Sequence, residues 1–500
     1  MSLLTDLPPE ILYHVLGYVD PRDLPRIPPT CKRLYYAITN NTALFKRVYL
    51  RNLDTPPPSP VDWEQSLKDL VRLDDLCRRD NVDDKKDELN FVHRAVTELL
   101  KNASIDGTRP PGPVGNPQSR NADFLTSFFA HDSNQSAFLC RSFIYERARA
   151  EFRSRDVTYW EGPPKPEHQK SAHLHCLYGV ARLLAYSSTL PQDRQNLMHP
   201  FACSKVYDLR QYTQKSKWGP FLNDGTMRVD WEKVEAVMIV LSANMQYLND
   251  SSMRMCKNFC CVPFAGTWPY SWKPRHALPR ADEVEASEQL DDPYGINGFW
   301  LRVVCFLDYS DFFAYNFSME QPPPHIPRPA LSKGQATRLI LMRMFVTKVE
   351  KPGPEDGQDL PVVHFKGVSR SLDQTFDENA DSHLRGTVRL TPEGEVRWTT
   401  FSIFGGVERW RSESIQLGGV RSAKGVLGHW FDTDFDPRGP AGPTAFWKIT
   451  DMHQRAESPT EGLGVHLDGV LAEVDGIDSY YESDDDAEED DNSSNESEDE

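Results

Sequence analysis

Apolar residues in the first 260 positions of the chain recur at steps of three and four, which is the spacing of one helix face. Over residues 3–50 this pattern predicts a compact unit of short helices. The first is LPPEILYHVLGYV, whose periodic apolar side chains are Leu7, Ile11, Leu12, Val15, Leu16 and Val19. Glu10 complements the positive N-terminal end of this helix, and Asp20–Pro21 ends it.

The second and third helices of this unit are shorter. Asp23 can cap a helix that starts at Leu24, but Pro25 and Pro28–Pro29 interrupt it because proline removes a backbone donor and clashes with the preceding turn. The third helix is expected around residues 31–38, where Cys31, Leu34, Tyr35 and Ile38 fall at helical spacing. Leu44, Phe45 and Val48 begin a further helical segment.

Helical spacing continues through the middle of the chain. A proline linker at 54–63 precedes a charged helical stretch at 61–101, and 103–120 has the composition of a flexible loop. A second helical block is expected from about 121 to 250. Its clearest amphipathic helices are HLHCLYGVARLLAYSS and WEKVEAVMIVLSANMQYL.

After residue 260 the period changes to two, and β-branched and aromatic residues become frequent. Strands are predicted at 298–307, 311–318, 336–349, 361–370, 384–391, 395–404, 407–417, 424–431 and 444–450. RLTPEGEVRWTTF is typical of a hairpin with alternating faces. So many strands at short spacing favour one antiparallel barrel or sandwich. Gly266-Thr267-Trp268 resembles the Gly-x-Trp entry of lipocalin-type barrels, although any barrel closed by a tryptophan would produce it.

These patterns predict an α+β multidomain chain with an acidic tail. The expected divisions are a helical N-terminal domain at 1–50, a helical linker with a proline-rich loop at 51–120, a helical domain at 121–255, an antiparallel barrel-like domain at 256–451 and a disordered tail at 452–500. The last nineteen residues hold twelve acids and no base, so they should remain disordered.

Charge and cysteine content narrow the partners and the compartment. The net charge is −18, and without the twelve tail acids it is −6, so we expect no nucleic-acid binding. There is no run of eighteen apolar residues and no basic, apolar leader, which predicts neither membrane insertion nor secretion. Nine scattered cysteines then indicate reduced thiols in the cytoplasm or the nucleus.

Enzyme and metal signatures are absent from the sequence. It contains no Gly-x-Ser-x-Gly, Walker, Gly-x-Gly-x-x-Gly or His-Glu-x-x-His motif. His173 and Cys176 are three residues apart, and Cys256, Cys260 and Cys261 form a second group, but neither group has paired zinc-ligand spacing. We therefore expect no catalytic residue, no metal and no cofactor.

The N-terminal residues resemble the F-box, the helical module that docks F-box proteins onto the Skp adaptor of cullin-RING ubiquitin ligases. The family pattern, Leu-Pro-x-Glu-(Ile/Val)-Leu followed by Asp-Leu and Cys-(Lys/Arg)-x-(Leu/Trp), is matched in order. The matching residues are Leu7, Pro8, Glu10, Ile11, Leu12, Val15, Leu16, Tyr18, Asp23, Leu24, Cys31, Lys32, Leu34 and Tyr35. The proline-rich segment 25–29 departs from the family pattern, which has Leu, Val or Ser there.

The resemblance implies a substrate-recognition subunit of an SCF ubiquitin ligase that is not itself catalytic. Its partners would be a Skp-type adaptor, through it a cullin, and a protein substrate whose identity the sequence does not give. The implied adaptor-binding residues are Leu7, Pro8, Glu10, Ile11, Leu12, Val15, Leu16, Leu24, Cys31 and Leu34. The order of the remaining elements is similar to that of F-box proteins common in filamentous fungi and, more distantly, of animal F-box proteins with a lipocalin-like barrel.

Candidate substrate-binding residues come from the strand-rich half. Asp432, Asp434 and Asp436 alternate ahead of Arg438 and could form a polar rim, a calcium site or a solvated turn. Arg397 and Arg409 lie among tryptophans and could bind an acidic degron. Two other functions stay open at this point: a lipocalin-like small-ligand-binding barrel, and a chaperone of basic proteins that acts through the tail.

Overall fold

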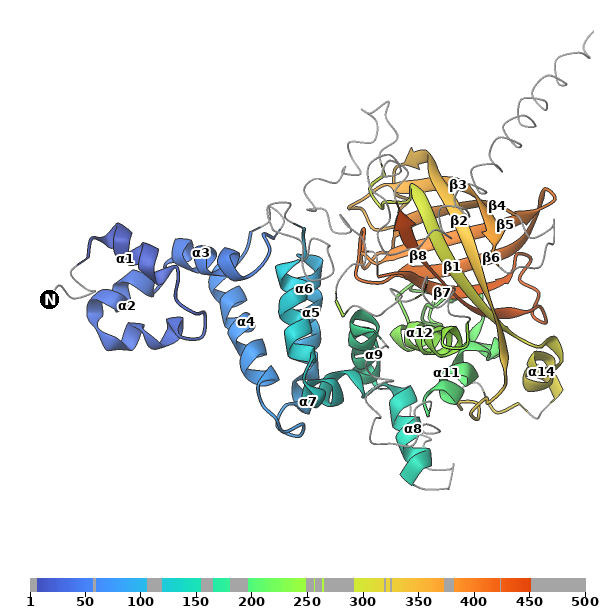
Figure 1. The fold of residues 1–500 in the computed structure, drawn as a ribbon, viewed down its shortest axis with the longest axis horizontal. Coiled ribbons are helices and arrows are strands. Elements are labelled where there is room, and N and C mark those ends of the chain that lie inside the picture. Colours follow the sequence, from blue (N-terminus) through green and yellow to red (C-terminus); the bar gives the residue numbers. More distant parts are fainter. Residues whose placement is uncertain are drawn as a thin grey trace, which may run out of the picture.

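The computed structural model describes residues 7–56, 60–105, 119–153, 165–179, 197–248, 256, 263–264, 292–318, 321–323, 326–372, 382–422 and 424–450. The expected entry tripeptide 266–268 and the expected tail at 452–500 lie outside these residues. Figure 1 shows the N-terminal helices at one end, a closed barrel at the other, and further helices between them. Among the described helices, none is long and apolar enough to cross a membrane.

The N-terminal helices follow the predicted pattern, with α1 at Pro9–Leu16, α2 at Lys32–Ile38 and α3 at Thr42–Asn52. The proline-rich segment between α1 and α2 folds as two 3-10 turns, Leu24–Arg26 and Pro28–Thr30. This is the expected effect of proline, because each turn needs fewer backbone donors than an α-helix.

The middle of the chain is helical, as predicted. Its α-helices are α4 (Trp63–Cys77), α5 (Leu89–Lys101), α6 (Arg120–Phe129), α7 (Asp132–Asn134), α8 (Phe143–Arg153), α9 (Pro166–Tyr178), α11 (His199–Val206) and α12 (Trp231–Met245). Shorter turns lie at Lys86–Glu88, Gln135–Leu139 and Leu209–Gln211. One hydrophobic core runs without a break from α1 through α5 and α6 to α9, so α1–α3 are packed against the rest of the helical region.

Helix α12 is not amphipathic, which corrects the prediction for 231–248. Of the other predicted amphipathic helix, 173–188, only the first residues fall in α9, and 180–188 lie outside the described residues. Nine of the thirteen residues of α9 and thirteen of the fifteen residues of α12 are buried. Helix α12 packs against α9 and α11 and also against β1, β2, β7 and β8. The charged residues of α12 are buried with partners. Glu232 accepts a hydrogen bond from the Phe143 amide (2.8 Å), and the Lys233 ammonium donates to the Phe221 carbonyl (3.0 Å).

The C-terminal half is a closed antiparallel barrel in which every strand pairs with its neighbour in sequence and β1 pairs with β8. The strands are β1 (Gly298–Leu307), β2 (Gln335–Glu350), β3 (Val362–Ser371), β4 (Ser382–Leu390), β5 (Val396–Phe404), β6 (Val407–Gln416), β7 (Val426–Asp432) and β8 (Ala441–Thr450). The expected hairpin is β4–β5, and Gly394 supplies the positive φ (87°) of its turn.

One of the nine predicted strands is wrong. Residues 311–318 are helical, in α14 (Tyr309–Phe313) and a π-turn at Ala314–Ser318. Asp308 caps α14 by accepting a hydrogen bond from the Ser310 amide (2.9 Å). Phe312 and Tyr315, three residues apart, are buried against the helical region, a helical spacing that the aromatic content of the segment concealed.

Candidate functional site

Helix α1 has apolar side chains on two faces. Leu12 and Leu16 point into the core and are almost fully buried. Ile11 and Val15 lie on the other face, and Tyr18 follows two residues after the end of the helix; 49%, 39% and 57% of their surface is exposed. A helix that needs only one apolar face to pack therefore keeps a second one in solvent, which is a feature of interaction surfaces.

Helix α2 adds more exposed apolar surface. The rings of Tyr35 and Tyr36 contact each other edge to face, with centroids 5.6 Å apart, and Tyr36 is 75% exposed. The Arg33 guanidinium donates to the Leu7 carbonyl (2.6 Å), which holds α2 beside the start of α1. At the N-terminus of α2 the Cys31 sulfur accepts from the Leu34 amide (3.5 Å), so this cysteine is a helix cap.

The structure divides the ten expected adaptor-binding residues into two groups. Leu12, Leu16, Leu24 and Leu34 lie inside the chain's own core, where they hold the helices together, and their contact with an adaptor stays a prediction. The others are exposed or half-buried, and their contact with an adaptor stays a prediction; they are Leu7, Pro8, Glu10, Ile11, Val15 and Cys31. The expected set omitted the exposed tyrosines of α1 and α2, which their helical spacing opposite Leu12 and Leu34 could have identified.

Basic residues border the exposed face of α1. The Arg51 and Arg47 guanidinium groups lie 4.2 Å and 6.0 Å from the Tyr18 ring, and Arg47 also bonds His14 (2.7 Å). These residues surround a shallow hollow of about 530 Å³ between α1 and α3. An arginine over an exposed aromatic ring is common where proteins meet, and acidic groups on a partner would complement this border.

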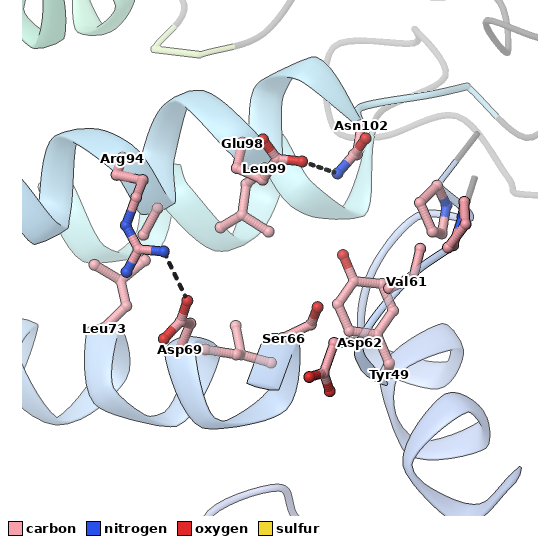
Figure 2. Close-up of a pocket in the computed structure, with 14 residues that line it drawn as sticks. Tyr49, Val61, Asp62, Ser66, Asp69, Leu73, Arg94, Glu98, Leu99 and Asn102 are labelled. Atoms are coloured by element: carbon pink, nitrogen blue, oxygen red, sulfur yellow. Dashed lines mark hydrogen bonds and ion pairs between the residues drawn. The ribbon is translucent and has the colours of Figure 1, made fainter. Parts of the chain in front are cut away.

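A pocket of about 340 Å³ lies where α3 meets α4 and α5 (Figure 2). Its carboxylates already have partners. Asp69 pairs with Arg94 (3.3 Å), Asp62 accepts from the Gln65 amide (2.9 Å), and Glu98 accepts from Asn102 (3.2 Å). Burial, together with the negative charges of Asp54 and Glu98, raises the pKa of Tyr49 to about 12, so its hydroxyl stays protonated. The Asp69–Arg94 pair joins α4 to α5, whereas the other two carboxylate contacts lie within the ends of single helices.

Asp54 links the end of α3 to the start of α6. Its buried carboxylate accepts hydrogen bonds from the Ser119 hydroxyl (2.5 Å), the Arg120 amide (3.0 Å) and the Ser104 amide (3.1 Å). In return, the Asp54 amide donates to Asn121 (2.9 Å). A carboxylate near the N-terminus of α6 is favourable because it satisfies free backbone donors there.

The aspartates of the β7–β8 loop support their own turns. Asp432 accepts from the Asp434 amide and Asp436 accepts from the Arg438 amide, both at 2.9 Å. The three carboxylates are not gathered, since no group of three metal-binding side chains occurs among the described residues. The arrangement favours the solvated-turn interpretation, and substrate binding by this loop stays a prediction.

Arg397 and Arg409 do not form one site. Arg409 is exposed, and its carbonyl accepts from the Thr433 amide (3.2 Å) beside the β7–β8 loop. Arg397 lies on β5 and pairs with Ile415 of the neighbouring strand β6, near the opposite end of the barrel. Its guanidinium donates to the Glu413 carboxylate (2.9 Å). Burial would raise the pKa of Glu413, but Arg397 and Arg411 outweigh burial and lower it. Arg397 is therefore occupied by an internal ion pair.

His173 and Cys176 do not form a metal site with each other either. The His173 ring stacks on Trp231 (centroids 3.6 Å apart) and bonds His93 (3.0 Å). Burial lowers the pKa of His93 to about 4 and that of His173 as well, so both rings are neutral. Of the second cysteine group, Cys256 is buried and Cys260 and Cys261 lie outside the described residues.

Comparison with known proteins gives one result. A family model described as F-box-like matches residues 4–51, which span α1, the two 3-10 turns, α2 and nearly all of α3. No curated protein and no solved structure matches the chain. The match covers the exposed apolar face of α1, and it agrees with the Leu-Pro-x-Glu-Ile-Leu and Cys-Lys-x-Leu elements of the sequence. Residues 4–51 are thus an F-box-like domain.

Proposed function

We propose that the protein is the substrate-recognition subunit of an SCF-type ubiquitin ligase, which docks on a Skp-type adaptor through α1 and α2 and presents a target protein with its barrel. The F-box-like domain is the observation that carries the proposal. The exposed second face of α1 supports it, because folding of this domain leaves Ile11, Val15 and Tyr18 without apolar neighbours to cover them.

The arrangement of the domains suits such a subunit. The exposed face of α1 and the barrel lie at opposite ends of the molecule (Figure 1), so both can bind a protein at the same time. F-box proteins generally serve as non-catalytic adaptors, and the ubiquitin transfer is then performed by the conjugating enzyme that the cullin recruits. The protein would work in the cytoplasm or the nucleus, where these ligases assemble.

Co-purification with a Skp adaptor tests the proposal. The Leu7→Ala, Pro8→Ala double variant should lose the adaptor, because both residues lie at the exposed start of α1. Its melting curve should match that of the parent, since neither side chain is fully buried. Undiminished recovery of the adaptor with the double variant, or no recovery with the parent chain, would reject the assignment.

A second candidate function is a small-ligand-binding barrel in the manner of lipocalins. The closed up-and-down order of the eight strands favours it, because such barrels can hold a ligand among their interior side chains. An apolar ligand that co-purifies with a chain unable to bind an adaptor would support this candidate.

A further inference from the structure

The interior of the barrel is divided into an apolar half and a polar half. The apolar half, toward the β4–β5 turn, is filled by a cluster that includes Trp300, Trp398, Phe365 and Phe446. The strand register places polar or small side chains on the same inner face toward the other end. They are Arg302, Ser369, Ser382, Thr400, Ser402, Ser412, Ser414, Gly428 and Thr444.

Arg302 is the only fully buried charged residue on this inner face among the described residues. The register places the exposed Arg338 and the half-buried Asp432 on the same face nearer the β7–β8 loop. Arg302 alternates on β1 with Leu301 and Val303, which face the helices outside the barrel, and it is 5% exposed. Its Nε donates to the Thr444 hydroxyl (2.9 Å). No carboxylate among the described residues pairs with it, and burial alone lowers the pKa of Arg302 to about 10.

A buried guanidinium without a counter-charge costs folding free energy, and such groups are normally paired. Here Arg397 and Arg411, on the outer face, are paired with Glu413, so the barrel does supply partners to other arginines. Other hydroxyls of this polar layer are engaged with one another, as in the Ser369–Ser382 (2.7 Å) and Thr400–Ser412 contacts. None of them carries a negative charge.

The remaining donors of Arg302 define the chemistry of a partner. Nε is engaged with Thr444, which leaves the two terminal nitrogens as a planar fork. A carboxylate matches such a fork with two parallel hydrogen bonds, and its single negative charge balances the single positive charge. The Ser414 hydroxyl, also on this inner face, is buried without a hydrogen-bond partner and could donate to the same anion.

Between Arg302 and the end of the barrel that carries the β7–β8 loop, the inner face is less completely buried. Val304, Trp410 and Trp430 face the interior nearer that end and are only half-buried. The Trp430 indole donates to the Cys305 carbonyl (3.1 Å), and a Cβ at Gly442 would come within 2.9 Å of its nitrogen. Glycine at 442 thus lets the indole lie against β8, next to Thr444.

We propose that the polar half of the barrel binds the carboxylate of a ligand through Arg302, with the apolar part of the ligand between Trp410, Trp430 and Val304. The carboxylate could belong to a free organic acid or to a peptide. In the second case the site would recognise part of the target protein, and that reading alone rests on the proposed ligase function.

Calorimetry on the full chain tests the site with two probes, phenylacetate and a tetrapeptide that ends in phenylalanine with a free carboxylate. Their neutral amides are the controls. We expect at least one acid to bind and its amide to bind about 10- to 100-fold more weakly. Arg302→Met should lose the preference for the acid, whereas Lys366→Met, which removes a charge from the outer face of β3, should keep it.

Stability measurements separate a binding role from a structural one. If Arg302 serves a ligand, Arg302→Met without ligand should melt at the same temperature as the parent or higher, because the variant buries no unpaired charge. If that variant does not fold, Arg302→Lys keeps the charge without the fork and should bind about 10-fold more weakly. Failure of both acids to bind at millimolar concentration, or equal binding of acid and amide, would overturn the proposal.

The choice of probe distinguishes the two sources of the carboxylate. Binding of phenylacetate but not of the tetrapeptide would assign the site to a free acid, and binding of the tetrapeptide would assign it to a target protein. Recovery of the Skp adaptor by Arg302→Met is measured in parallel. Helix α1 and strand β1, which carries Arg302, lie toward opposite ends of the molecule (Figure 1), so failure of one proposal leaves the other testable.

Discussion

Ile11 and Val15 are the side chains whose removal tests adaptor docking most directly, because they are exposed on α1 while their neighbours Leu12 and Leu16 hold the helix in place. The change is Ile11→Ala with Val15→Ala. Both substitutions shorten side chains that make few contacts inside the chain, and alanine favours the helix. The variant should therefore fold as the parent does.

The loss of affinity can be worked out from the exposed fractions. Complete burial of an isoleucine or valine side chain contributes about 1.5–3 kcal/mol, and 49% of Ile11 and 39% of Val15 remain to be covered by a partner. Each side chain can then contribute about 1 kcal/mol to docking. Loss of both should raise the Kd for the adaptor about 30-fold.

Surface-immobilised Skp adaptor and the purified chain give this Kd, and thermal melting of the same samples checks the fold. Val407→Ala is the matched control, since Val407 is 67% exposed on the barrel and should leave the Kd unchanged. Leu12→Ala is the contrasting variant, which should cost about 2–5 kcal/mol of stability. An unchanged Kd for the Ile11, Val15 double variant would refute the idea that the outer face of α1 meets the adaptor.

Three further predictions concern buried side chains that can ionise. Asp54→Ala should lower the free energy of unfolding by about 3 kcal/mol, because three donors lose their acceptor; Asp23→Ala, at an exposed position, should change it by less than about 0.5 kcal/mol in urea titrations. Glu413→Gln should cost about 3 kcal/mol, and the lowered pKa of Glu413 gives a contribution to stability that is complete above about pH 5 and is lost as the pH falls below 4.5. His93 is protonated near pH 6.5 in the unfolded chain and only near pH 4 in the folded chain. The melting temperature should therefore fall as the pH is lowered from 6.5 to about 4, and it should fall less in His93→Phe.

The regular elements of the fold could be predicted from the sequence because their periodicity reports directly on burial. Eight of the nine expected strands exist, and the hairpin between β4 and β5 follows from its turn residues. The strand predicted at residues 311–318 is wrong because aromatic residues are frequent both in strands and in helices that pack on one side. The burial of α12 on all sides could not be predicted from the sequence pattern, because its charged residues pair with side chains that are distant in the sequence.

The site was less predictable than the fold. The Leu-Pro-x-Glu-Ile-Leu element located the docking domain, but a motif does not say which of its leucines face inward. Arg397 was expected to bind a substrate and instead pairs with Glu413, sixteen residues away on the next strand. Arg302 was not a candidate, because only the closure of β1 onto β8 shows that it points into the barrel and that no carboxylate of the described residues pairs with it.

The contacts of Asp54 also bear on which lysines of a captured target would receive ubiquitin. They hold α3 and α6 together, and the core that continues to α9 leaves no free hinge between them. If the chain is the substrate receptor proposed above, the span from the cullin arm to the barrel is fixed by the receptor and not by the target. A short insertion at the junction of α3 and α4 should move ubiquitin to different lysines without changing the affinity for adaptor or target.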